Sequence, residues 1–76
     1  MTADDIKNTI SANLPCDYIT LEGDGRHWYA TIVSAEFEGK RLIQRHQIVY
    51  AALGDRMREE IHALSMKTLT PEEFQG

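Results

Sequence analysis

Three histidines, His27, His46 and His62, are the side chains of this sequence best suited to metal chemistry, and each stands in a different setting. His62 follows Ile61, the last apolar residue of a predicted helical segment, and directly precedes a predicted strand. At such a junction one ring nitrogen can be exposed while a backbone carbonyl holds the other, which fixes the tautomer that metal ligation requires. His62 is therefore a candidate ligand, and a surface or half-buried histidine fits the same pattern.

The other two histidines have weaker claims. His27 stands where a glycine-rich turn enters a predicted strand, so its ring could point out beside the turn or lie flat on the sheet. His46 shares a helical stripe with Leu42 and Val49, which favours a packed or hydrogen-bonded residue at the edge of the core. We therefore take His27 as the second candidate ligand and assign His46 to the fold.

The number of available ligands limits what metal this chain could hold. Structural zinc normally has four protein ligands and catalytic zinc has three, so two histidines cannot close a site alone. Cys16 is the other candidate, but it should lie at the end of a hairpin remote from His27, and a partly buried structural residue is favoured. Any metal would have to be shared with a partner. A 2Fe-2S cluster with sulfur ligands on one iron and two histidine nitrogens on the other has chemical precedent.

No arrangement of residues indicates an enzyme. Ser65 lies three residues from His62, which in a strand places the two on opposite faces, and the sequence contains no Gly-x-Ser-x-Gly elbow or phosphate-binding loop. The adjacent glutamates at 59–60 and 72–73 are typical of a solvated surface. We expect no catalytic residues.

A basic cluster, Lys40, Arg41 and Arg45, precedes and opens the second predicted helix. These side chains could contact nucleic-acid phosphates, an acidic protein or a peptide such as glutathione, or they could simply be solvated. The formal net charge of -4 and the lack of interleaved aromatic residues count against nucleic acid.

The elements that must position these residues follow from hydrophobic periodicity. Ile6, Ile10 and Leu14 recur at helical spacing after a possible capping box at Thr2, whereas residues 28–33 are mostly aromatic or β-branched. The sequence predicts a helix at about 3–14, strands at about 17–22 and 27–33, a helix from about 42 that is interrupted at Gly54 and restarts, a strand at 63–69 and a terminal turn from Pro71. Within the second helix, Leu42, His46, Val49 and Leu53 are predicted to form one apolar stripe, widened by Ile43 and Tyr50.

This α-β-β-α-α-β order predicts an α+β fold, with a three-stranded mixed sheet and helices on one face, because the first two strands pair as a hairpin and the third returns after a helical crossover. We expect residues 1–76 to form one domain. A single cysteine, the lack of a signal-peptide-like leader and the lack of any apolar run of about 20 residues predict a cytoplasmic protein.

Several motifs together resemble the BolA family over nearly the whole chain. They are Phe37-Glu38-Gly39-Lys40, then Leu42-Ile43-Gln44-Arg45-His46 with Val49-Tyr50, and His62-Ala63 through Lys67-Thr68-Leu69-Thr70-Pro71-Glu72-Glu73-Phe74. The resemblance implies a fold like the class II KH domain. It also implies loss of KH-type nucleic-acid binding, because Leu53-Gly54-Asp55-Arg56 stands where that class has its Gly-x-x-Gly loop.

The resemblance also implies a function. Family members pair with monothiol glutaredoxins and share a bridged 2Fe-2S cluster in iron-sulfur trafficking, maturation or iron sensing. By position, His62 matches the C-terminal histidine ligand of the family, and His27 is the only candidate here for the second ligand. A cysteine of the glutaredoxin and its glutathione would supply the sulfur ligands. Two alternatives stay open: a DNA-binding transcriptional regulator using helix two with Lys40, Arg41 and Arg45, and a metal-free adaptor that binds the glutaredoxin through the last strand and the terminal turn.

Overall fold

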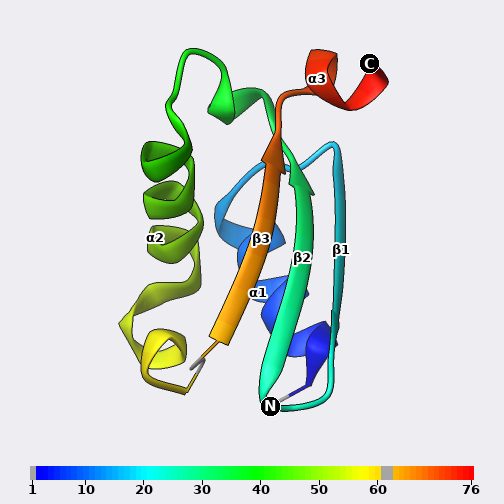
Figure 1. Cartoon of the computed structure of the whole chain (residues 1–76). Helices are drawn as coiled ribbons and strands as arrows, with labels where there is room; N and C mark the ends of the chain where they lie inside the picture. The colour runs from blue at the N-terminus through cyan, green and yellow to red at the C-terminus, as the bar shows by residue number, and fades with distance from the viewer. Residues whose placement is uncertain (1, 61–62) are drawn as a thin grey trace.

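The computed structural model describes residues 2–60 and 63–76, and its element order is the predicted one (Figure 1). The elements are α1 (Ala3–Asn13), β1 (Tyr18–Gly23), β2 (His27–Val33), the short 3-10 helix η1 (Ala35–Phe37), α2 (Leu42–Glu60), β3 (Ala63–Leu69) and α3 (Pro71–Gln75). The predicted capping box is present at α1, where the Thr2 hydroxyl accepts from the Asp5 amide at 3.2 Å and the Asp5 carboxylate accepts from the Thr2 amide at 2.9 Å. None of the helices within the described ranges is long and apolar enough to cross a membrane.

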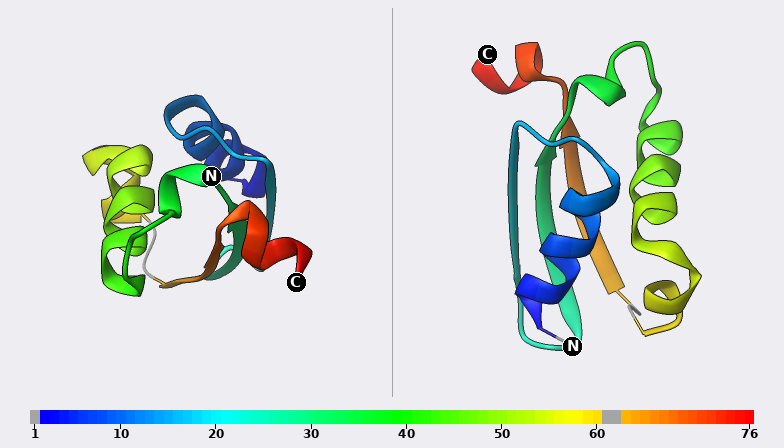
Figure 2. Two further views of the ribbon diagram at one scale, coloured as in Figure 1. Left: turned by 90° about the horizontal axis from the view of Figure 1, so that it is seen from above. Right: turned by 180° about the vertical axis from the view of Figure 1, so that it is seen from behind.

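The three strands form a mixed sheet in the order β1-β2-β3, as predicted. β1 pairs antiparallel with β2, and β3 pairs parallel with β2. The register places Gly23 opposite Trp28 and His27 opposite Ala63. The helices α1 and α2 lie side by side on one face of this sheet, which Figure 2 shows end-on.

The core lies between that face and the two long helices. Its buried side chains come from α1, β2, η1 and α2, and they are Ile6, Ile10, Leu14, Trp28, Ala30, Ile32, Phe37, Val49, Ala52 and Leu53. Trp28, Ala30 and Ile32 of β2 point inward, because the pleat of a strand sends alternate side chains to the same face. Phe37 is fully buried and anchors η1 in the core.

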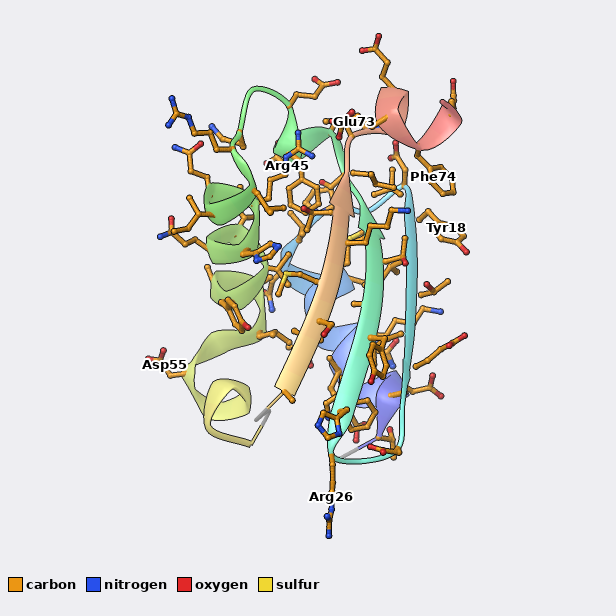
Figure 3. All side chains as sticks on the ribbon, viewed as in Figure 1. Tyr18, Arg26, Arg45, Asp55, Glu73 and Phe74 are labelled. Carbon is orange, nitrogen blue, oxygen red and sulfur yellow. The ribbon has the colours of Figure 1, made fainter. Side chains whose placement is uncertain are left out.

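The opposite face of the sheet is largely open. Tyr29 lies near its centre with 58% of its surface exposed. Within the described residues, one end of this face is covered: the ring of Phe74 in α3 stacks on Tyr18 with 4.8 Å between centroids, and Val33, in register with Tyr18, is fully buried (Figure 3). α3 therefore closes one end of this face.

The second helix differs from its predicted apolar stripe at one end. Gly54 interrupts it with a left-handed φ of 79°, as expected. Leu42 and Ile43, however, are 63% and 66% exposed, so their predicted place in the stripe was wrong. The buried side of α2 is formed further along, around Val49 and Leu53, whereas the first turn is held by polar contacts of the Gln44 and Arg45 side chains.

Candidate metal centre

The turn between β1 and β2 fixes the start of β2 through one carboxylate. Asp24 Oδ1 accepts hydrogen bonds from the amides of Arg26 at 2.8 Å and His27 at 2.9 Å, and the Asp24 amide donates to the His27 carbonyl at 3.3 Å. Gly25 takes the left-handed φ of 97° that such a turn requires. The His27 and Arg26 amide bonds lower the pKa of Asp24, so this carboxylate remains ionised in mildly acidic solution.

Gly23 anchors the same turn to the core. A Cβ at Gly23 would collide with the His27 carbonyl oxygen and with the indole ring of Trp28, which is only 5% exposed. The sequence marks residues 23–26 as a turn by composition, but this close approach was not predicted, because it depends on the position of the indole. Asp24 could have been found from sequence, since aspartate commonly caps backbone amides in turns.

His27 is the only predicted metal ligand that falls within the described residues. It is exposed, opens β2 and pairs with Ala63, the first residue of β3. His62 directly precedes Ala63 in the sequence and lies outside the described residues, so its assignment stays a prediction. The sheet thus brings the residue after His62 next to His27. Arg26 extends away from the molecule at this end of the sheet (Figure 3).

The described side chains around His27 offer too few donors to hold a metal ion by themselves. Among the described side chains, those of residues 2–55 and 63–76, no group of three or more histidine, cysteine, aspartate or glutamate residues could hold a metal ion. The imidazole of His27 makes no hydrogen bond to another described residue, so both ring nitrogens are available. An exposed imidazole suits iron as a ligand. His27 fits one position of a shared cluster and could not hold that cluster alone.

Cys16 belongs to the fold. Its side chain is partly buried, and its Sγ donates to the Leu14 carbonyl at 3.2 Å. Burial raises the pKa of the Cys16 thiol, with a further contribution from the Asp17 carboxylate. Cys16 precedes β1, whereas the turn that carries His27 follows it, so the two side chains lie at opposite ends of the strand.

His46 is half-buried on α2, which agrees with its predicted place at the edge of the core. Its Nε2 atom is buried and has no hydrogen-bond partner among the described residues, and the same holds for the hydroxyl of Thr68 on β3. A buried ring nitrogen of this kind cannot reach a cluster at the surface without rearrangement. His46 is therefore a packing residue.

Arg45 ties three elements together, so the structure separates it from the other two members of the predicted basic cluster. Its Nε donates to the Lys40 carbonyl at 3.0 Å, and its Nη1 donates to the Thr68 carbonyl at 3.1 Å and to the Glu73 carboxylate at 2.7 Å (Figure 3). Only 14% of its side chain is exposed. The bond to Arg45, with one from the Thr70 amide, lowers the pKa of Glu73. Lys40 and Arg41 remain exposed.

The three-stranded mixed sheet with helices on one face defines a small α+β protein, and this class can be compared with known families. A family model described as "BolA-like protein" matches residues 7–73. The chain belongs to the BolA-like family.

Individual relatives agree with this assignment. BolA-like protein 2 of Mus musculus is 35% identical to this chain, over 97% of the chain and 91% of that protein. A protein of Haemophilus influenzae named "DNA-binding transcriptional regulator BolA" is 42% identical over 71% of this chain and 52% of its own length. Among solved structures, a bolA homologue from Coxiella burnetii superposes with a TM-score of 0.84 at 42% identity, covering 100% of this chain and 99% of that one.

Proposed function

We propose that this chain is a non-enzymatic partner of a monothiol glutaredoxin and shares a bridged 2Fe-2S cluster with it, in iron-sulfur trafficking, maturation or iron sensing. The observation that carries the proposal is the position of His27: exposed, held by a closed turn, and paired with the residue that follows His62 in the sequence.

In the proposed complex, His27 and His62 would each hold the shared cluster through one neutral imidazole nitrogen. A cysteine of the glutaredoxin and the thiol of its glutathione would supply the sulfur ligands. When bound, the cluster provides one-electron chemistry, and histidine ligation raises its potential above that of a cluster held by sulfur alone. Thiolate ligands from the partner require a reducing compartment such as the cytoplasm.

The β1–β2 turn gives His27 a fixed base. Two amide bonds to the Asp24 carboxylate and the contact between Gly23 and Trp28 hold the backbone on both sides of it. A ligand held by a rigid backbone loses less conformational freedom when it binds than one on a mobile loop. The turn therefore favours capture of a cluster that a partner delivers.

Reconstitution with a monothiol glutaredoxin, glutathione, iron and sulfide tests the proposal. We expect visible absorption and circular dichroism spectra that differ from those of the glutaredoxin homodimer. His62→Ala should abolish or strongly alter the new spectrum, and His27→Ala should perturb it without abolishing the complex of the two proteins. His46→Ala is the matched control, because it should affect folding alone. An unchanged spectrum in His62→Ala, or a changed one in a folded His46→Ala protein, would refute the ligand assignment.

A second candidate, DNA binding by the start of α2, is favoured by the name of the Haemophilus influenzae relative. That relative is about twice as long as the segment this chain matches. Because Arg45 is engaged with Glu73 and Thr68, phosphate contacts in this chain would depend on Lys40 and Arg41. DNA affinity that falls steeply with added salt and drops in Arg41→Ala supports this function; affinity indifferent to both excludes it.

A further inference from the structure

Four consecutive residues, Lys40, Arg41, Leu42 and Ile43, form a surface that neither the fold nor the shared metal site accounts for; we name it the basic-apolar tip. All four are exposed. Leu42 and Ile43, at 63% and 66%, are the most exposed of the large apolar side chains in the described part of the chain. Two exposed aliphatic side chains thus follow two exposed cations directly in the sequence, at the start of α2.

The tip departs from what helix stability favours. The first turn of α2 carries no acidic residue, and the residues that precede it are Lys40 and Arg41. Cations at this end of a helix oppose the macrodipole, whereas carboxylates there stabilise it, as Asp4 and Asp5 do at α1. Exposed leucine and isoleucine also gain nothing from folding. Residues that break local rules without compensation in the fold are expected at functional surfaces.

The two cations are free to act on a partner. The Arg41 amide donates to Gln44 Oε1 at 2.9 Å, but among the side chains of residues 2–55 and 63–76 neither the Arg41 guanidinium nor the Lys40 ammonium forms an ion pair. Arg45, one turn along, already contacts Glu73. The tip therefore presents two unneutralised positive charges on a chain whose formal net charge is -4.

The tip and the candidate metal centre lie at opposite ends of the molecule. In Figure 1 the loop entering α2 is at the top with α3, whereas the β1–β2 turn and the start of β2 are at the bottom. The longest dimension of the molecule is 31 Å. A partner at one end can therefore bind without displacing a partner at the other.

We propose that the basic-apolar tip is a docking surface for a second protein, one that presents a small apolar patch bordered by carboxylates. Lys40 and Arg41 complement the carboxylates, and Leu42 and Ile43 bury their exposed surface against the patch. The proposal is independent of the shared cluster, because no residue of the tip belongs to the metal centre. Together the two ends would make the chain an adaptor.

The surrounding charges select a protein rather than a membrane or a duplex. Exposed Glu36 and Glu38 precede the tip, and exposed Glu72 lies on α3 at the same end of the molecule (Figure 1). An anionic bilayer or a nucleic acid extends its negative charge well beyond the tip and would meet these carboxylates, with repulsion that acts over a Debye length of about 8 Å. A narrow acidic patch on a protein meets only the two cations.

A synthetic helical peptide with one glutamate-rich and one leucine-rich face provides the probe. We expect saturable binding by fluorescence anisotropy, with amide shift changes in nitrogen-15 spectra centred on residues 39–44 and absent from 24–29. Leu42→Ser with Ile43→Ser should weaken binding about tenfold, because two aliphatic contacts are lost. Lys40→Glu with Arg41→Glu should weaken it at least as much.

The matched control is Tyr29→Ser with Lys67→Glu, which removes one exposed apolar and one exposed basic side chain from the open sheet face and should leave affinity unchanged. Saturating glutaredoxin should also leave it unchanged. Shift changes centred away from the tip, or tip variants that bind the peptide as tightly as the unaltered protein does, overturn the proposal. Tip-dependent binding to phosphatidylserine vesicles or duplex DNA that exceeds binding to the peptide overturns the choice of partner. If the protein fails to form a complex with glutaredoxin, the shared-cluster proposal fails, but binding of the peptide to the tip should be unaffected.

Discussion

Replacing Arg45 by alanine separates its structural role from a role in surface charge. The guanidinium joins the loop before α2, the end of β3 and α3, and it loses three acceptors at once in Arg45→Ala. If Arg45 were part of an exposed basic cluster, its removal would have almost no effect on folding, because surface substitutions usually change stability by less than about 0.5 kcal/mol.

The expected loss follows from the burial of each acceptor. The Thr68 carbonyl belongs to a residue only 5% exposed, and an unsatisfied buried acceptor costs about 1–3 kcal/mol. The exposed Lys40 carbonyl recovers a water molecule and contributes little. The pair with Glu73 contributes little to stability, because that carboxylate is well solvated. We therefore expect a loss of about 2 kcal/mol, from a total that for this chain length is on the order of 4–11 kcal/mol.

Urea unfolding followed by far-ultraviolet circular dichroism and by fluorescence of the single tryptophan, Trp28, measures this loss. With an m value of about 1 kcal/mol/M, the midpoint should fall by about 2 M. The thermal midpoint should fall by about 8–16 °C. Arg41→Ala is the matched control and should remain near the wild-type values. Equal stability of the two variants would show that the Arg45 contacts contribute nothing to the free energy of unfolding. Arg45 would then act as a surface cation like Lys40 and Arg41.

Three further predictions concern the turn, the core and acid stability. Gly23→Ala should destabilise the protein by about 1–3 kcal/mol in the same urea assay, because the added Cβ meets backbone and a buried ring; a smaller loss would mean that the turn can shift. Thr68→Val should be neutral or stabilising by up to about 1 kcal/mol, since it removes a buried hydroxyl without a partner in the described structure; a clear loss would reveal one. Asp5, Asp24 and Glu73 have lowered pKa values, so their stabilisation is full above about pH 5 and is lost as pH falls through the unfolded and then the folded values; urea midpoints that stay level from about pH 6 to about pH 2 would contradict this.

Local sequence patterns predicted most of the architecture. The limits of β2 and β3 and the break at Gly54 follow from periodicity and from one glycine, and both depend on neighbouring residues alone. Contacts between residues far apart in the sequence could not be predicted from these local patterns. The helical spacing of Arg45 cannot reveal that a glutamate in α3 and a carbonyl in β3 lie beside it, because that depends on how the chain returns across the sheet.

The candidate site divides in the same way. His27 was predicted as a candidate metal ligand from its place after a glycine-rich turn, and in the structure its side chain is exposed there. Its role as a ligand stays a prediction. The contact of Gly23 with the indole was not predicted, since composition does not give the position of a side chain across a hairpin. The exposure of Leu42 and Ile43 was missed for a related reason: periodicity shows which residues share a helix face, but it does not show how far along the helix the core extends.

The parallel pairing of β2 with β3 has a consequence for the order of folding. The β1–β2 hairpin closes over a short turn, which takes on the order of microseconds in isolated hairpins. The pairing of His27 with Ala63 instead encloses η1 and all of α2, so it bears a larger loop-closure entropy and forms late. A nascent chain from which β3 has not yet emerged therefore displays His27 without the neighbouring strand. Only a fully synthesised and folded chain presents the complete end of the sheet.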